Sequence, residues 1–310
     1  GDGARVHVNA VMYGEARAIA EIAAATGDKA LADRFMRCAG EIERAMKERL
    51  WNRDLGFFVP EGTNGVQKTV RELHGYSPWY FGMDLKGFGS AWKPLMEPEG
   101  FNAKWGLTFL ERRTPGFRIS YEGHPCQWNG PVWPYATSLT LTALANALES
   151  GTSGSVTASD YVELLRRYAA AQVRVRQAGT IVPWIDENLD PFTGEWIARN
   201  HMIAWAREGI RKMTYRERGK DYNHSTFCDL VLSGLVGIRP QSGNRLVVSP
   251  LFPSSWDYLK VERVAYHGRE ISITWDRTGG RYGGKPGLTV FVNGQERAHA
   301  DVLERIELAL

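Results

Sequence analysis

Residues 126–138 read CQWNGPVWPYATS, and the helix-favouring run LTLTALANAL follows at once over residues 139–148. Pro131 and Pro134 fix the backbone φ angle, so the first segment cannot form a regular strand or the middle of a helix. The change from Pro-rich to apolar composition predicts a loop that enters a helix over residues 133–149.

This loop carries two indoles, Trp128 and Trp133, together with the amide of Asn129. Flat aromatic faces beside an amide suit a sugar, whose C–H bonds stack on the ring while its hydroxyl groups need fixed hydrogen-bond partners. The alternative is that both indoles belong to the core, since tryptophan is highly buried on average.

Apolar residues recur at helical spacing on both sides of the loop. Upstream, Val11, Ala18, Ile19 and Ile22 predict a helix over residues 9–26. Further helices are predicted over residues 28–51, 160–171 and about 225–236.

Two other regions have a different pattern. Residues 52–125 are rich in Gly and Pro and predict long excursions between helices, which commonly build a site. After Pro240 the pattern alternates in twos, and Asn293-Gly294 is a strong signal for a tight hairpin. We therefore expect a mainly α fold, an α/α toroid over residues 1–240 with an antiparallel β unit over residues 241–310.

Composition excludes several classes of function. The 310 residues include 38 basic and 35 acidic side chains, giving a net charge of +3 without a basic run, so a nucleic-acid partner is not expected. No apolar stretch is long enough to span a membrane. The first residues are Gly-Asp-Gly, so we expect a fragment or a processed product. Neither a cellular compartment nor an oligomeric state is predicted.

The three cysteines, Cys38, Cys126 and Cys228, lie far apart in the sequence without CxxC spacing. This spacing excludes a disulfide framework and a cysteine-based zinc site, and we expect buried thiols. No group of His, Asp and Glu residues has convincing metal-ligand spacing, and no cofactor is implied.

The segment PWIDENLDPFTGEW, residues 183–196, holds Asp186, Glu187, Asp190 and Glu195 among large aromatic residues. A carboxylate beside indoles is partly desolvated, which raises its pKa and suits proton transfer near neutral pH. The alternative is an Asp-Pro turn whose acids face water.

Three ordered segments, CQWNGPVWPYATS, ENLDPFTGEW and DYNHSTFCDLVLSGLVGIRP, resemble the catalytic half of the (α/α)6-toroid glycosidases. These enzymes are related to trehalases and glycoside hydrolase family 63, and the mannosylglycerate-hydrolase-like branch is the most similar. Residues 8–28 resemble the family's helix after the general-acid loop, and residues 239–251 resemble its C-terminal β piece. The resemblance covers nearly the whole chain and implies a partial (α/α)6 toroid that is incomplete at its N-terminus.

The resemblance also implies roles for individual residues. Family members hydrolyse α-glycosides with inversion, using an aspartic acid to protonate the leaving oxygen and a glutamate to activate water. That glutamate falls on Glu187, and the family's aromatic motif falls on Trp128, Asn129 and Trp133, which are implied to hold the cleaved sugar. The general acid lies upstream of the helix that opens this chain, where Asp2 is the only acid.

Further candidate substrate contacts come from neighbouring segments. Glu122 and His124 precede the aromatic motif and could reach sugar hydroxyls, although a histidine in a surface loop is more often idle. Trp79 could form the wall of a subsite or belong to the core. Glu195, in the acidic segment, completes the set.

The leading prediction is an inverting α-glycosidase that acts on a small glycoside or oligosaccharide without a cofactor. Sugar 2-epimerases use a similar toroid, but they rely on paired histidines, and none of the seven histidines is expected to pair with the core motifs. A non-catalytic carbohydrate-binding or structural fragment is the alternative, because the general acid is missing from the sequence.

Two expectations follow for the catalytic residues. Trp128, Asn129, Trp133 and Glu187 should converge on one concave pocket, since loops at the same end of a helical toroid line one funnel. In a protein that carries the missing upstream segment, Glu187→Gln should lower kcat by roughly 10²–10⁴ with little change in folding stability. The same change at the neighbouring acids, Asp186→Asn or Asp190→Asn, should cost much less.

Overall fold

The computed structural model describes residues 3–119, 127–175, 179–209, 219–221, 223 and 225–310. The chain forms two compact units. The first comprises Gly1–Thr157 and Leu164–His224, and the second comprises Ala158–Glu163 and Ser225–Leu310.

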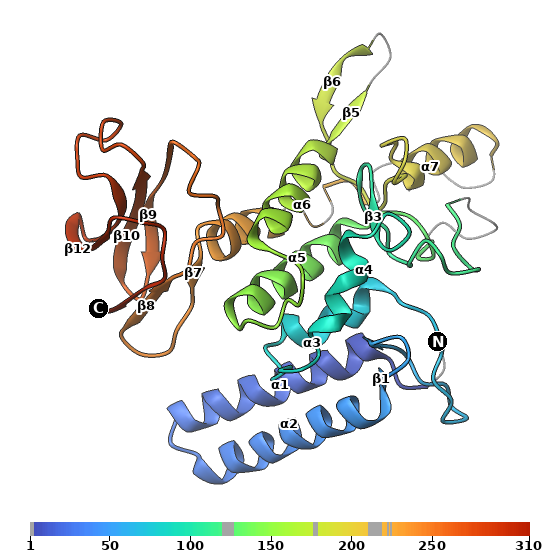
Figure 1. Ribbon diagram of the computed structural model, residues 1–310. Coiled ribbons are helices and arrows are strands. Elements are labelled where there is room, and N and C mark those ends of the chain that lie inside the picture. Colours follow the sequence, from blue (N-terminus) through green and yellow to red (C-terminus); the bar gives the residue numbers. More distant parts are fainter. Residues whose placement is uncertain (1–2, 120–126, 176–178, 210–218, 222, 224) are drawn as a thin grey trace. The chain divides into compact units, whose positions relative to one another are not determined.

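The first unit opens with a helical hairpin. Helices α1 (Val6–Ala25) and α2 (Lys29–Arg49) pack against each other along their length (Figure 1). Gly27 takes a φ of +83° in the turn between them, and the Asp28 carboxylate accepts the N–H of Leu31 at 3.0 Å. Both helices therefore begin and end close to the predicted positions.

The buried face of α1 differs from the predicted one. Ile19 and Ile22 are 37% and 64% exposed, although their spacing predicted a core face. The buried face of α1, a helix that contacts α2 and the following short helices, is instead rich in alanine. Its buried residues are Val6, Ala10, Tyr13, Ala16, Ala20 and Ala23.

The Gly- and Pro-rich region after α2 forms short elements joined by turns, as expected for excursions between helices. They comprise the paired strands β1 (Trp51–Asn52) and β2 (Phe57–Phe58), the short helices η1 (Leu73–Tyr76), α3 (Ser77–Tyr80), η2 (Gly89–Trp92) and α4 (Lys93–Met96), and the paired strands β3 (Asn102–Ala103) and β4 (Gly106–Leu107).

Helix α5 (Pro134–Glu149) is the central helix of this unit. Pro134 stands in its first turn, where a missing N–H costs nothing, and most of the helix is buried. It packs against η1 and α3, which also contact α1. Residues far apart in sequence, at the starts of α1, η1 and α5, are thereby brought together.

Three further elements follow α5. Helix α6 (Ala158–Ala171) begins in the second unit and ends in the first, close to its predicted bounds. The hairpin of β5 (Val173–Val175) and β6 (Ile181–Pro183) and helix α7 (Ile197–Arg207) have no counterpart in the sequence prediction.

The second unit contains the last predicted helix and the strands. Helix α8 (Thr226–Asp229) continues as a π-helix, η5 (Leu230–Leu235). The Tyr161 hydroxyl donates to the carbonyl of Leu230 at 2.8 Å. A Cβ at Gly234 would lie 1.9 Å from that hydroxyl oxygen, so this position requires glycine.

Seven strands form two antiparallel sheets. One has the order β13-β8-β7 and the other β12-β11-β10-β9. Asn293 and Gly294 form the turn between β11 and β12 with φ values of 51° and 77°, as predicted. A mainly α fold with a C-terminal antiparallel β unit is therefore confirmed. The strands are β7 (Ile238–Arg239), β8 (Arg245–Val248), β9 (Tyr258–Tyr266), β10 (Arg269–Asp276), β11 (Gly287–Val292), β12 (Gln295–Ala300) and β13 (Ile306–Ala309).

The cysteines are less buried than expected. Cys228 is exposed and Cys38 is half-buried, while Cys126 lies outside the described residues. The prediction of buried thiols is wrong for Cys228, because α8 is a four-residue helix without a buried residue.

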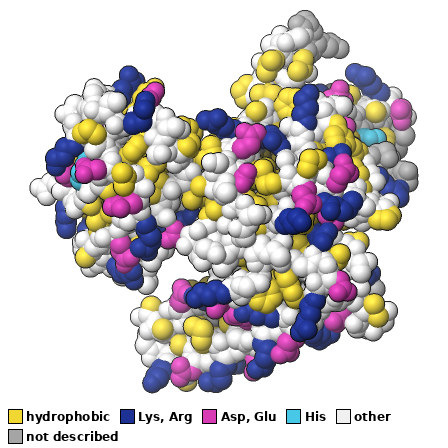
Figure 2. All heavy atoms as spheres, in the orientation of Figure 1, with side chains coloured by type: hydrophobic (Ala, Val, Ile, Leu, Met, Phe, Trp, Pro, Cys, Tyr) yellow, Lys and Arg dark blue, Asp and Glu magenta, His cyan; other side chains and the backbone are white. Residues whose placement is uncertain are grey.

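Surface charge is mixed in sign. Basic and acidic side chains are interspersed on the face shown in Figure 2. Within the described part of the chain, no helix has the length and hydrophobicity to cross a membrane, and no group of three or more His, Cys, Asp or Glu residues could hold a metal ion.

Candidate active site

A hollow of about 450 Å³ lies beside the aromatic loop. Its lining combines an ion pair, an imidazole, two amides and an aromatic wall. The segment before α1, the start of η1, the chain after β4 and the aromatic loop contribute to it. The lining residues are Arg5, Glu72, His74, Phe109, Leu110, Gln127, Trp128 and Asn129.

The two indoles of the aromatic loop have different surroundings. Their rings stack with centroids 3.9 Å apart and an angle of 9° between planes. Trp133 is 1% exposed and donates its Nε1–H to the carbonyl of Gln127 at 2.8 Å, whereas Trp128 is half-buried and lines the hollow. Trp133 therefore supports the ring of Trp128 from within the core.

Backbone and amide hydrogen bonds fix the aromatic loop. The Asn129 side-chain amide donates to the backbone carbonyl of Gly116 at 3.0 Å, and the backbone carbonyl of Asn129 accepts the N–H of Arg118 at 2.9 Å. A Cβ at Gly130 would lie 1.9 Å from the Arg118 carbonyl oxygen, so glycine is required there. Asn129 consequently lines the hollow in a fixed orientation.

The hollow contains a buried carboxyl group. Glu72 is 8% exposed, and its Oε1 lies 3.3 Å from the Arg5 guanidinium. Burial raises the pKa of Glu72, and the neighbouring Arg5 opposes that shift. Glu72 therefore keeps its proton to a higher pH than a free carboxyl does, and in that form it can donate a hydrogen bond.

Two histidines stack beside this carboxyl. The rings of His7 and His74 lie 4.4 Å apart with an angle of 11° between planes, and His74 also contacts Trp128. Burial, with the neighbouring His7 and Arg5, lowers the pKa of His74 to about 3. The Nε2 atom of His74 is buried and has no hydrogen-bond partner among the described residues.

His7 is held at both ring nitrogens. Its Nδ1 lies 2.9 Å from the Ser77 hydroxyl, and its Nε2 lies 2.9 Å from the Tyr135 hydroxyl. Burial lowers the pKa of His7. The sequence-based expectation that no histidine pairs with the core motifs is wrong, because α1, η1 and α5 bring these side chains together. Neutral imidazoles of lowered pKa are nevertheless poor proton-transfer groups near neutral pH.

The acidic segment pairs with the aromatic loop through backbone hydrogen bonds. Val132 and Leu189 exchange N–H···O bonds of 2.9 Å in both directions. Glu187, two residues before Leu189, is half-buried and donates its N–H to the Asp186 carboxylate at 3.0 Å. The structure thus joins the two predicted motifs, although Glu187 is not among the residues that line the hollow.

Comparison with known families shows to which family the chain belongs. Residues 1–225 match the family described as the mannosylglycerate hydrolase MGH1-like glycoside hydrolase domain. The chain belongs to this family. Residues 238–298 are similar to the C-terminal domain of glycosyl hydrolase family 65. The resemblance inferred from the sequence motifs is therefore confirmed.

Solved structures similar to this MGH1-like chain include one named "Sialidase", with 37% identity and a TM-score of 0.85. The match covers 98% of this chain and 26% of that one, so the chain spans about a quarter of the length of that relative. The GH63 mannosylglycerate hydrolase from Thermus thermophilus in complex with glucose has 18% identity, a TM-score of 0.49, and coverage of 74% and 47% of the two chains. Neutral trehalase from Saccharomyces cerevisiae has 16% identity, a TM-score of 0.44, and coverage of 69% and 39%.

Two other predicted site residues of the MGH1-like domain, Trp79 and Glu195, are not among the lining residues of the hollow. Trp79 is 2% exposed in the aromatic core and donates its Nε1–H to the Thr152 hydroxyl at 3.1 Å. Glu195 is exposed. Three predicted residues, Asp2, Glu122 and His124, lie outside the described residues.

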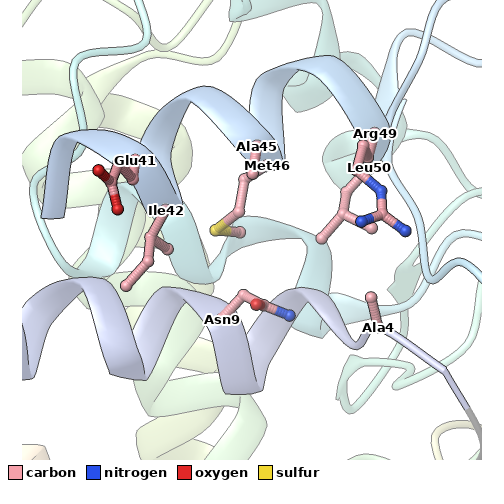
Figure 3. Close-up of a pocket in the computed structure, with 8 residues that line it drawn as sticks. All are labelled: Ala4, Asn9, Glu41, Ile42, Ala45, Met46, Arg49 and Leu50. Atoms are coloured by element: carbon pink, nitrogen blue, oxygen red, sulfur yellow. The ribbon is translucent and has the colours of Figure 1, made fainter. Parts of the chain in front are cut away.

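A second, smaller hollow of about 240 Å³ lies between α1 and α2 (Figure 3). Its lining is mainly aliphatic, with Ile42 and Met46 between the helices. Arg49, at its rim, forms an ion pair with Glu61. This hollow has no aromatic residue in its lining, so the site assignment rests on the hollow beside Trp128.

Sequence reasoning missed Arg5, Glu72 and His74 as lining residues of the domain. They come from segments that carry no periodic or motif signal around them. The only local signal is RELHGY at residues 71–76, where two charged side chains and an imidazole stand together just before an aromatic stretch.

Proposed function

We propose that the protein is an inverting glycoside hydrolase that cleaves an α-glycosidic bond in a small glycoside or oligosaccharide. The observation that carries this proposal is the backbone pairing of Val132 with Leu189. This pairing ties the loop of Glu187 to an aromatic loop that lines a sugar-sized hollow. Membership of the MGH1-like glycoside hydrolase family supports the same reaction class.

In the proposed reaction Glu187 is the general base. It takes a proton from a water molecule while the water oxygen attacks the anomeric carbon, and the glycosidic bond breaks toward the leaving oxygen. Inversion requires a second carboxyl group about 6.5–9.5 Å away, which protonates the leaving oxygen. We propose that this general acid lies upstream of residue 1.

The hollow supplies substrate-binding groups in this proposal. Trp128 offers an indole for stacking and Asn129 an amide, with Trp133 as support. Glu72, when protonated, and His74 each offer a donor or an acceptor for sugar hydroxyls. Glu122, His124 and Glu195 are kept as candidate substrate contacts, and Trp79 as a residue of the supporting core.

We also propose that the chain divides into two domains near residue 240. Residues 1–240 form the glycosidase domain, and residues 241–310 form an accessory β unit. The strands β8 to β13, which all lie after residue 244, support this division, and among the strands of the two C-terminal sheets only the short strand β7 precedes it.

Hydrolysis of glycosyl fluorides provides a direct test. Fluoride leaves with the electron pair of its bond to carbon and needs little protonation, so the assay requires the base but not the general acid. We expect release of fluoride from an α-glucosyl or α-mannosyl fluoride and, by NMR, a product of β configuration. Glu187→Gln should abolish most of this activity.

A sialoside is tested as a further substrate, because one similar structure is named "Sialidase". Sugar binding without fluoride release would favour the alternative, a non-catalytic carbohydrate-binding fragment. A product of α configuration would contradict the inverting mechanism.

A further inference from the structure

A buried ion pair between Asp186 and Arg199 lies next to the proposed base, Glu187. Asp186 is 0% exposed and Arg199, on α7, is 2% exposed. The Arg199 Nε donates to Asp186 Oδ2 at 2.7 Å, and the indole N–H of Trp184 donates to the same oxygen at 3.2 Å. One carboxylate oxygen is thus saturated by two donors from the surrounding core.

The other carboxylate oxygen reaches Glu187. Asp186 Oδ1 accepts the backbone N–H of Glu187 at 3.0 Å. Gly219 lies on this side as well, since a Cβ there would be 2.6 Å from Glu187 Cγ and 2.8 Å from Asp186 Oδ1. The backbone of Glu187 is tied to the ion pair, and the chain at Gly219 packs closely against its side chain.

Ion pairs with this degree of burial are a poor source of stability. Desolvation of the two charges offsets their attraction, and well-packed apolar residues of similar volume are often as stable or more stable. A carboxylate that bridges α7 and the Glu187 amide instead fixes geometry. General-base catalysis depends on such geometry, because a displacement of about 1 Å can cost about 10²-fold in rate.

We infer that Arg199 is a positioning residue that acts through Asp186 to hold Glu187 in place for attack by water. This inference rests on the proposed function. Arg199 does not contact the reacting atoms in this scheme. It fixes the carboxylate that receives the Glu187 N–H, and the chain at Gly219 packs against the Glu187 side chain.

The test compares Arg199→Gln with Arg207→Gln, a matched change at an exposed position on the same helix. With a glycosyl fluoride as substrate, Arg199→Gln is expected to lower kcat about 10²-fold with little change in KM. Arg207→Gln should leave both constants unchanged. Circular dichroism and thermal unfolding identify any variant that has lost its fold.

A double-mutant comparison separates positioning from a general structural role. If Arg199 acts through Glu187, Arg199→Gln should lower kcat much less in a Glu187→Gln background than in the wild type. Equal losses in both backgrounds would overturn the inference. Arg199→Lys, which keeps the charge but not the planar guanidinium, should recover only part of the activity.

A measurement that does not depend on activity keeps the inference testable. Hydrogen exchange of the Glu187 amide should be about tenfold faster in Arg199→Gln than in the wild type, the equivalent of one hydrogen bond to a charged group. Unchanged exchange would contradict the positioning role. Wild-type protein that hydrolyses no substrate would instead contradict the proposed function, and the exchange comparison would still decide the inference.

Gly219→Ala provides a second variant if Arg199→Gln does not fold. Its Cβ would press against Glu187 Cγ and Asp186 Oδ1 without changing any charge, and the φ of +82° at this position adds backbone strain. In a variant that unfolding measurements show to be folded, a loss of kcat with unchanged KM is expected. Retention of wild-type kcat in a folded Gly219→Ala protein would show that the Glu187 position is not constrained from this side, and would overturn that part of the inference.

Discussion

Among single residues, the stacked pair Trp128 and Trp133 has the clearest division of roles. One indole is half-buried at the hollow and the other is buried beneath it. Trp133→Ala should lower the free energy of unfolding by about 3–5 kcal/mol, because it opens a large cavity. Trp128→Ala should have a smaller effect on stability and should weaken sugar binding. Urea unfolding and ligand titration of the two variants check this. Equal destabilisation by both changes would contradict it.

The acidic segment requires a revision of the expected mutational pattern. Glu187→Gln is still expected to lower kcat by roughly 10²–10⁴ with little change in stability. Asp186→Asn, expected from the sequence to be mild, should instead destabilise the protein by about 3–5 kcal/mol, because it breaks the buried ion pair with Arg199. Asp190→Asn is the mild control, since an amide oxygen can still accept the N–H groups of residues 192 and 193. Fluoride-release kinetics and urea unfolding of all three variants test the pattern.

The buried histidine predicts a pH dependence of stability. The pKa of His74 is about 3 in the fold and about 6.5 when the chain is unfolded, so between these values the unfolded state binds more protons. The contribution of neutral His74 to the free energy of unfolding is therefore present in full above about pH 6.5 and is lost as the pH falls below that value. Between pH 7 and pH 5 the loss from His74 should be about 2 kcal/mol.

Urea unfolding at a series of pH values measures this slope. The His74→Gln variant, which cannot titrate, should show a smaller slope. The remaining slope includes the contribution of His7, whose lowered pKa has the same sign of effect. An identical slope in the variant and the wild type would contradict the assignment to His74.

For the helices and strands, predictability depends on which residues occupy the buried faces. Helix α7 was missed because one of its buried positions carries Arg199, so the apolar period is interrupted. The face of α1 was assigned wrongly because large aliphatic side chains point outward and alanines pack inward. By contrast, α5 and the turn at Asn293-Gly294 were predictable, since proline and glycine fix local backbone geometry.

The candidate site was predictable only where a contiguous motif carries it. Trp128 and Asn129 stand in such a motif and line the hollow. Arg5, Glu72 and His74 reach it because α1, η1 and α5 pack together, a relation between segments more than sixty residues apart. Sequence pattern does not encode that relation.

The π-helix η5 of the second unit requires glycine at one position, Gly234. Gly234→Ala would place a methyl group 1.9 Å from the Tyr161 hydroxyl oxygen and should destabilise the protein by about 1–3 kcal/mol. Gly40→Ala is the matched control, because a Cβ there meets no atom within 4 Å on α2. That change should stabilise by about 0.5–1 kcal/mol. Thermal unfolding compares the two, and a neutral Gly234→Ala would contradict the packing described.

Across the whole molecule, two compact units predict unfolding that is not two-state. Calorimetry should give an unfolding enthalpy larger than the van't Hoff value. Gly234→Ala should shift the transition of the second unit more than that of the first. A single transition with equal enthalpies would show that the units unfold as one.

Helix α6 limits how the two units can be separated in a gene. Its opening residues, Ala158–Glu163, belong with the strands, while its remainder belongs with the helical unit. A gene cut at any single position therefore cannot separate the two units: a cut after residue 224 leaves residues 158–163 with the first unit, and a cut before residue 158 carries residues 164–224 along with the second. The second unit, transplanted without Tyr161, would leave the Leu230 carbonyl without its tyrosine donor. Recombination can transfer the second unit whole only if it also carries residues 158–163, which lie within the sequence range of the first unit. We therefore expect the two units to be inherited together.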